Sequence, residues 1–345
     1  MRFTSLKSAL VASVVSASLG ACVTPPLLDL GGDAGQGLDA GAVESDSSIP
    51  GDAQGNAVHG CTPGAWSSSA TGWIVFDSDV DGMVRHVFAV RPGDCAFLQL
   101  TFGEAADQEP AVSPDGSTLV FSSSRSADGS FQLFALDLAS HALTQLTTVT
   151  GGAGQPAFSP DGAMLAYHSG YSVYRMAADG SGGPAVLVSS AGSAEGTYEH
   201  PAFLPDGNRI VVDRQNEIDS FDLQGQGEQS LVENYTEDEL YPAVSPDGTL
   251  LAFVSPCNAL TNVMIASLAA PRAPPCSARI WTPSILEGIT HPTWGPSAWI
   301  AFARLAGDHL DRVAISDESQ QIYDLAVGQG DQLHPVWAPG SFNPN

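Results

Sequence analysis

The sequence predicts an all-β fold, a six-bladed β-propeller whose ring is closed by the C-terminal strand. Three observations support this prediction. A short proline-rich motif recurs along the chain, complete copies are followed by apolar segments of strand length, and the final copy stops after its first strand. Strand-rich repeats of about 45 residues are typical of propeller blades, each built from four strands.

The recurring motif is found at six places. The copies read EPAVSPDG (109–116), QPAFSPDG (155–162), HPAFLPDG (200–207), YPAVSPDG (241–248), HPTWGPS (291–297) and HPVWAPG (334–340). Successive turn prolines are separated by 46, 45, 41, 50 and 43 residues. The last two copies lack the aspartate, but the spacing still places each of them at the start of a blade unit.

The Pro-Asp-Gly step of the motif predicts a tight turn between two strands. Proline presets φ for the second position of a type I turn, and glycine adopts the left-handed conformation that other residues avoid. Such a turn commonly joins antiparallel strands. We therefore expect structural turns at four places: Pro114, Asp115 and Gly116; Pro160, Asp161 and Gly162; Pro205, Asp206 and Gly207; Pro246, Asp247 and Gly248.

Apolar segments after each turn supply the remaining strands. The second strands read TLVF, MLAY, RIVV and LLAF, and a third strand is expected at segments such as 131–138 and 172–178. A fourth strand is expected near 142–147 in the first complete unit. No unit shows an apolar period of 3.6 residues, which argues against an α-solenoid.

The copy at 334–340 has no further strands after it, whereas the first blade, at 72–101, needs an inner strand. We expect the C-terminal segment to supply that strand, because closure removes exposed sheet edges. An alternative remains open. Residues 64–76 resemble a degenerate first strand, so Trp66 and Trp337 compete for one place, or a seven-bladed ring with a partial blade forms.

The motif resembles the WD40-like PD40 repeat of the TolB propeller family. The resemblance is carried by the Pro-x-[Phe/Val]-x-Pro-Asp-Gly runs at 110–116, 156–162, 201–207 and 242–248, with Leu204 where the other three copies have serine. It covers roughly residues 65–345. It does not cover a TolB-type N-terminal domain, whose place is taken by a low-complexity segment.

The N-terminus has the features of an export signal. Arg2 and Lys7 precede an apolar run from Ala9 to Leu19 that is too short to span a bilayer. The run ends at Leu19-Gly20-Ala21-Cys22, which looks like the lipobox of bacterial lipoproteins. This resemblance implies cleavage before Cys22 and lipidation of its thiol, although an ordinary secretory signal with a chance cysteine is the alternative.

These features divide the chain into a signal peptide at 1–21, a disordered acidic Gly/Ala/Asp-rich tether at 22–60 and the propeller at 61–345. The residue after the predicted lipid cysteine is valine rather than aspartate. By resemblance to lipoprotein sorting in Gram-negative bacteria, we expect anchoring in the outer membrane, facing the periplasm or the cell surface.

Lipidation of Cys22 would leave an even number of cysteines. In an oxidising compartment these can form two disulfides, and their proximity in sequence favours Cys61–Cys95 and Cys257–Cys276, one of three possible pairings. Four unpaired buried thiols are the alternative. No CxxC spacing is present, which argues against zinc binding and redox catalysis.

The charge balance excludes one class of partner. The chain carries 12 Lys+Arg against 38 Asp+Glu, a net charge of −26, and so acidic a surface repels nucleic acid. The only lysine is Lys7, so the mature chain would have no lysine chemistry. No G-x-S-x-G, H-E-x-x-H or P-loop motif occurs. We expect a monomer without a cofactor.

One register position forms the best candidate site. The residue before the first proline of each motif is, in order, Glu109, Gln155, His200, Tyr241, His291 and His334. Inner strands of a propeller line its channel, so we expect these six to ring one mouth of the channel. They could form a binding site for a ligand or peptide. Three histidines could also hold a divalent metal, as in some propeller lyases, or simply form a polar rim.

A second metal hypothesis concerns the segment DSDVDG at 77–82. Asp77, Asp79 and Asp81 have the alternating spacing with which a calcium loop begins, but Phe88 stands where an EF-hand needs glutamate. A plain turn between strands is the alternative interpretation.

Taken together, the residues favour a lipid-anchored cell-envelope propeller that binds an envelope protein or peptide through its channel face and is not catalytic. Its contact with the membrane would be through the lipid alone. Two alternatives remain open: a metal-dependent, lyase-like enzyme that uses the channel histidines on an acidic polysaccharide, and a display or spacer module without a ligand.

Overall fold

The fold is described from a computed structural model of the 345-residue chain. The residues it describes are 70–80, 84–189, 196–214, 217–233, 239–256, 261–269, 279–282, 288–305, 310–325 and 330–344. The chain divides into two units, 1–54 and 55–345, and all described residues belong to the second. Within these residues, no helix is both long and apolar enough to cross a membrane.

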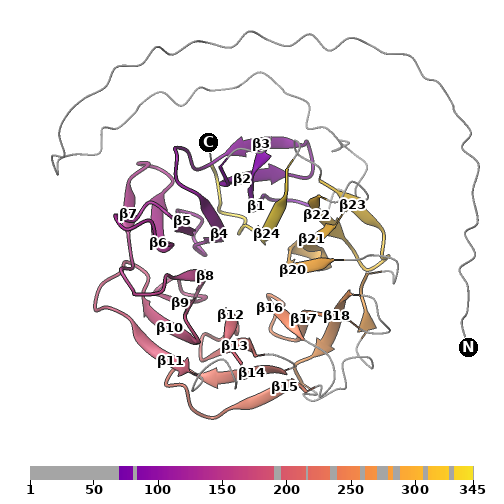
Figure 1. Cartoon of the computed structure of the whole chain (residues 1–345). Helices are drawn as coiled ribbons and strands as arrows, with labels where there is room; N and C mark the ends of the chain where they lie inside the picture. The colour runs from indigo at the N-terminus through magenta and orange to yellow at the C-terminus, as the bar shows by residue number, and fades with distance from the viewer. Residues whose placement is uncertain are drawn as a thin grey trace, which may run out of the picture. The chain divides into compact units, whose positions relative to one another are not determined.

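The described residues form six four-stranded antiparallel sheets arranged as the blades of a propeller (Figure 1). The first three blades contain β24 (Gln332–Trp337), β1 (Ile74–Ser78), β2 (His86–Arg91) and β3 (Ala96–Gln99); β4 (Asp107–Val112), β5 (Thr118–Ser123), β6 (Gln132–Asp137) and β7 (Leu143–Gln145); and β8 (Gly154–Phe158), β9 (Met164–Ser169), β10 (Ser172–Ala177) and β11 (Ala185–Ser189).

The other three blades contain β12 (Glu199–Phe203), β13 (Arg209–Arg214), β14 (Glu217–Asp222) and β15 (Gln229–Glu233); β16 (Leu240–Val244), β17 (Leu250–Ser255), β18 (Asn262–Ser267) and β19 (Arg279–Ile280); and β20 (Ile289–Trp294), β21 (Ile300–Leu305), β22 (Asp311–Ser316) and β23 (Ile322–Asp324). Each blade runs outward from its inner strand, which carries the recurring motif.

The C-terminal strand closes the ring, as the sequence predicts. β24 pairs antiparallel with β1, with Trp337 opposite Ile74. The Trp337 indole N–H donates to the Thr71 carbonyl at 2.9 Å, and the Ala338 N–H donates to the Trp73 carbonyl at 2.8 Å. The sixth motif therefore completes the first blade, and the part of the chain that the structure describes contains six blades. Trp66, the rival candidate, lies outside the described residues.

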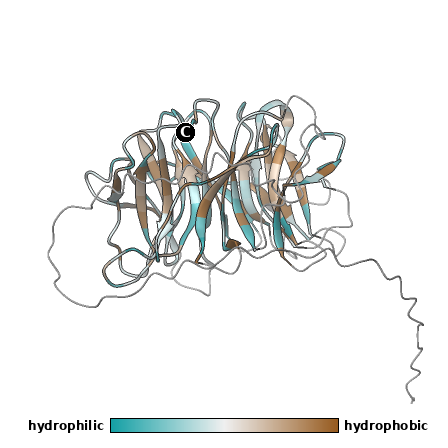
Figure 2. Cartoon of the chain, turned by 90° about the horizontal axis from the view of Figure 1, so that it is seen from above, coloured by the Kyte–Doolittle hydropathy of each residue, from teal (hydrophilic) through white to brown (hydrophobic). Residues whose placement is uncertain are grey.

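The apolar core lies between adjacent blades. Along β5, Leu119 and Phe121 pack toward the first blade, whereas Val120 packs toward the third blade. Successive strand residues point to opposite faces of a sheet. Because both faces of a blade are covered by neighbours, the second strand of a blade reads as a continuous apolar run. Figure 2 shows these apolar residues within the strands of the ring.

Side-chain hydrogen bonds support the Pro-Asp-Gly turns. In the second blade, the Ser113 hydroxyl donates to the Asp115 carboxylate at 2.6 Å, and the Ser117 N–H donates to the same oxygen at 3.0 Å. Gly116 has a φ of 74°. In the sixth blade, which lacks this turn sequence, the 3₁₀ turn η5 (Pro296–Ala298) takes its place.

Candidate functional site

A cavity of about 500 Å³ lies in the channel of the propeller, between the inner strands. All six residues predicted to ring the channel line it: Glu109, Gln155, His200, Tyr241, His291 and His334. The rest of the lining is mainly apolar, with the motif prolines, Phe158, Phe203 and Trp294. Cavities of this size and character are common ligand sites.

The six ring residues share an unusual backbone conformation. Each is a non-glycine residue in the left-handed region, with φ between 45° and 57°. In β4, Gln108 pairs with Ser122 and Ala111 with Val120, so Glu109 and the following proline oppose a single residue of β5. This is a β-bulge, and the same shift of register occurs in the other five inner strands.

The proline explains the bulge, because it has no N–H to offer to the strand ladder. The bulge turns the preceding side chain toward the channel. Left-handed backbone at a non-glycine residue is costly and persists only where the surroundings enforce it. Its repetition at all six positions indicates that the motif itself sets the direction of the ring side chains.

Side chains of the preceding blade accept hydrogen bonds from the backbone N–H groups of four ring residues, Glu109, Gln155, His200 and Tyr241. The Gln155 N–H donates to Glu109 Oε2 at 2.8 Å, and the His200 N–H donates to Gln155 Oε1 at 2.9 Å. The Glu109 and Tyr241 N–H groups donate to the carboxylates of Asp77 and Asp213, at 3.0 and 2.8 Å. The ring is thus held together by contacts from one blade to the next.

Two buried carboxylates also orient two of the histidines. His334 Nδ1 donates to Asp77 at 2.6 Å, and His200 Nδ1 donates to Asp213 at 2.9 Å. Burial disfavours the charged imidazoles, but the adjacent carboxylates outweigh this effect and raise the pKa of both His200 and His334 above 6.5. Each pair therefore favours the imidazolium form.

His291 lies between these histidines and behaves differently. Its ring centroid is 4.2 Å from that of His334 and 4.0 Å from that of Tyr241. Its Nδ1 has no hydrogen-bond partner among the described residues. Burial, together with the neighbouring His334 and His200, holds the pKa of His291 well below 6.5. The base of the cavity therefore contains a neutral histidine flanked by two that favour protonation.

Asp213 is absent from the residues predicted for a site, and Asp77 was predicted only as a calcium ligand. Both aspartates end equivalent runs on second strands, in IVFD at 74–77 and IVVD at 210–213. That shared register is the signal that could have revealed them. Asp77 also pairs with Arg85 at 2.6 Å.

The residues predicted for calcium and for disulfides are only partly described. Asp79 Oδ1 accepts the Asp331 N–H at 2.7 Å, whereas Asp81 lies outside the described residues. Cys22, Cys61, Cys257 and Cys276 also lie outside them, so the predicted lipidation and pairings stay predictions. Across the described part of the chain, no group of three or more His, Cys, Asp or Glu side chains is arranged to hold a metal ion.

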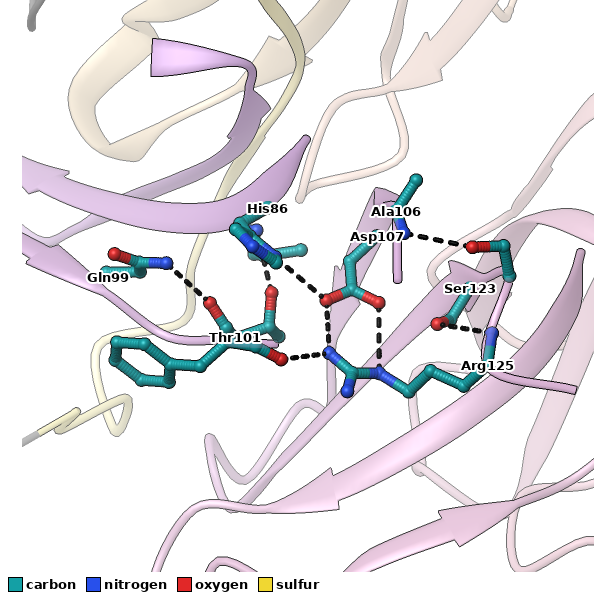
Figure 3. A network of polar contacts seen from close by, with 10 residues as sticks. His86, Gln99, Thr101, Ala106, Asp107, Ser123 and Arg125 are labelled. Atoms are coloured by element: carbon teal, nitrogen blue, oxygen red, sulfur yellow. Dashed lines mark hydrogen bonds and ion pairs between the residues drawn. The ribbon is translucent and has the colours of Figure 1, made fainter. Parts of the chain in front are cut away.

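A second polar network joins the first two blades but does not line the cavity (Figure 3). The buried Asp107 carboxylate accepts hydrogen bonds from Arg125 at 2.5 Å and from His86 Nδ1 at 3.3 Å. Burial opposes ionisation of Asp107, but the bonds from His86 and Arg125 lower its pKa. Because its carboxylate is fully engaged, we interpret this network as structural.

The fold and the channel ring define a closed β-propeller with a cavity in its channel. The family model described as PD40, the TolB beta propeller domain, matches residues 99–273, about half of the chain, and the chain belongs to this family. A search of curated proteins found no match.

Several solved structures share the fold. TolB from Acinetobacter baumannii is 18% identical with a TM-score of 0.66, and the match covers 79% of this chain and 67% of that one. A nidogen/laminin complex gives a TM-score of 0.60 at 8% identity, covering 77% of this chain and 98% of that one. An oligogalacturonate lyase in complex with manganese gives 0.51 at 15% identity, covering 74% of each chain.

Proposed function

We propose that this chain is a lipid-anchored envelope propeller that binds a protein or peptide partner through its channel face, without catalysis. The observation that carries the proposal is the channel cavity. Its wall is mainly apolar, and one end carries the six polar ring residues, whose backbone conformation is set by the motif. A preformed cavity lowers the cost of ordering groups on binding. Membership of the TolB propeller family is consistent with binding to proteins.

The binding proposal is tested by cross-linking and affinity capture from a cell-envelope extract. Ala157 lines the cavity on β8, and an Ala157→Trp variant would fill part of that space. Val186, on the outer strand β11, is 54% exposed, and Val186→Trp serves as the matched control. We expect one partner to be captured by the wild type and by the control but not by Ala157→Trp. Equal capture by all three would reject the channel as the binding face.

The proposed localisation rests on the sequence of the first 60 residues. We propose cleavage before Cys22, lipidation of that cysteine and anchoring in the outer membrane, with residues 22–60 as a tether. Labelling cells with radioactive palmitate tests this. We expect label in the wild type and none in Cys22→Ser, and label in both would contradict the assignment. Peptide mapping under non-reducing conditions tests the Cys61–Cys95 and Cys257–Cys276 pairings.

A second candidate function is a metal-dependent enzyme acting on an acidic polysaccharide. The observation that favours it is the gathering of His200, His291 and His334 at the base of one cavity. Metal analysis of the purified protein, with His200→Ala and His291→Ala variants, distinguishes the two functions. Stoichiometric metal that is lost in both variants would favour the enzyme. Calcium retained by both variants would instead favour the site at 77–82.

A further inference from the structure

Among the described residues that line the channel cavity, Glu109 is the only acidic side chain, and no arginine or lysine lines it. Two of the lining histidines, His200 and His334, favour the protonated form. The three ring histidines are the remaining ionisable bases. A charged group of a ligand in the cavity can therefore contact the Glu109 carboxylate but no arginine or lysine of the lining.

The groups directly behind the ring add to this negative charge. Asp77 and Asp213 are buried against the histidines, and Glu199 precedes His200 and acts on its imidazole. Arg85, which forms an ion pair with Asp77, is the arginine among these groups. Together with Glu109, the carboxylates number four. They outnumber the cations even if both His200 and His334 are protonated, so the base of the cavity stays negative.

The wall of the cavity suits a long aliphatic side chain with a charged end. Its apolar surface comes from motif prolines and from the aromatic residues Phe158, Phe203 and Trp294. Lysine and arginine bury their methylene stems against such surfaces while the charged head seeks a polar partner. Aromatic faces also attract cations. The whole chain, at a net charge of −26, attracts basic partners at long range.

We infer that the channel cavity accepts a lysine or arginine side chain presented by a peptide segment of the partner, with the Glu109 carboxylate as its counter-charge. This inference rests on the proposed function and specifies the chemistry of the partner. The cavity, at about 500 Å³, has room for that side chain and parts of its neighbours.

A comparison of two adjacent blades indicates that the contact of Glu109 with the next blade does not require its charge. Glu109 Oε2 accepts the Gln155 N–H at 2.8 Å. In the next blade Gln155 Oε1 accepts the His200 N–H at 2.9 Å, the same contact made by a neutral amide. A glutamine at 109 can therefore keep the contact between blades. The charge of Glu109 also acts on the imidazoles of His200 and His334, so a ligand cation would share the Glu109 carboxylate with them.

The test measures the affinity of the full-length protein in detergent for three N-acetylated, C-amidated pentapeptides. They share the frame Gly-Ser-X-Ser-Gly, where X is lysine, norleucine or glutamate, and binding is followed by calorimetry. We expect the lysine peptide to bind about ten-fold more tightly than the norleucine peptide, the size of one charge pair in a partly desolvated cavity. The glutamate peptide should bind least.

Three variants locate the effect. Glu109→Gln should abolish the preference for lysine over norleucine, and Gln155→Glu, which adds a carboxylate at the equivalent position, should increase it. Glu228→Gln makes the same charge change at an exposed residue of the fourth blade that does not line the cavity, and it should leave the preference unchanged. Thermal melts confirm that each variant is folded.

The inference is overturned if the three peptides bind equally, if none of them binds, or if Glu109→Gln keeps the preference. The proposed function is judged separately, by capture of a partner that depends on the cavity. If Glu109→Gln captures that partner as well as the wild type does, the function stands and the lysine or arginine inference fails. If no partner depends on the cavity, the proposed function itself fails.

Discussion

His334 donates a hydrogen bond from Nδ1 to Oδ1 of Asp77 at 2.6 Å, across 257 residues of sequence. Asp77 lies on β1 and His334 on β24, the two strands that close the ring. The same carboxylate accepts the Glu109 N–H of the second blade at 3.0 Å. One buried aspartate therefore connects ring closure, the histidine ring and the next blade.

Replacing Asp77 with asparagine should destabilise the fold strongly. Asparagine keeps the shape and one acceptor oxygen, but it removes the charge that pairs with Arg85 and His334. Breaking a buried ion pair leaves its cation uncompensated, and we expect a loss of about 3 kcal/mol in the free energy of unfolding. Chemical denaturation provides the measurement.

The control for this variant is Asp94→Asn. Asp94 pairs with Arg91 at 2.6 Å, but both side chains are roughly half exposed. Exposed ion pairs contribute less than about 1 kcal/mol, so we expect a small loss. Equal losses in the two variants would show that Asp77 is an ordinary surface partner and would contradict its central role in the ring.

The stability contributed by His334 should depend on pH. The groups around its imidazole are Asp77, Glu109, Arg85 and His291, and the net effect is to raise its pKa in the folded state above 6.5. Its contribution is therefore full below pH 6.5 and is lost as the pH rises through the folded-state pKa. His334→Gln should destabilise the protein more at about pH 5.5 than at about pH 9.

His291 provides the opposite case in the same cavity. Its pKa in the folded state is well below 6.5, so its stability contribution is full above that pH and falls as the pH drops. His291→Gln should therefore destabilise the protein less at the acidic pH than at the alkaline one. Parallel pH profiles for the two histidine variants would contradict the charge assignment of the ring.

Gly295→Ala should disturb the junction between the sixth and first blades. A Cβ at Gly295 would lie well inside van der Waals contact distance of three atoms of the Trp337 ring. The glycine has a φ of −108°, so the effect would come from crowding and not from backbone strain. We expect a loss of about 1–3 kcal/mol, which thermal unfolding can detect. Gly93→Ala, with no atom within 4 Å of its Cβ position, should cost little by comparison.

Removing β24 should abolish cooperative unfolding. Deletion of residues 332–345 would expose the edge of β1. It would also remove the buried side chains of Trp337, Ala338 and Phe342 from the apolar clusters on the two faces of the first blade. Calorimetry would show a broad or absent transition. Deleting only residues 344–345, beyond the last buried side chain, is the control and should leave the transition intact. An unchanged cooperative transition in the longer deletion would reject closure by β24.

Most of the propeller could be predicted from the sequence because its signals are local. Proline and glycine restrict the backbone at each turn whatever the rest of the chain does, and an apolar run such as TLVF at 118–121 indicates a strand covered on both faces. The ring position was also predictable, since one residue precedes the first proline of each motif. The number of motif copies then predicts the number of blades.

The left-handed backbone of the ring residues was not predictable, because glutamate, glutamine and tyrosine rarely adopt that region, and histidine, although enriched there, does so only in a small minority of cases. This conformation depends on the pairing of the inner strand with the second strand, in which the motif proline cannot donate a hydrogen bond. Asp213 and Asp77 were likewise missed as partners of histidines, because a side-chain contact between strands follows from register and not from spacing along the chain.

By itself, the sequence determined the fold class, the blade number and the six residues that face the channel, because each follows from a repeated local pattern. Only the tertiary structure decided which of those residues carry charge. His200 and His334 have equivalent places to His291, yet the buried carboxylates behind the first two raise their pKa while burial lowers that of the third. Protonation depends on contacts between strands and on burial in the channel, and both exist only once the chain has folded and the ring has closed.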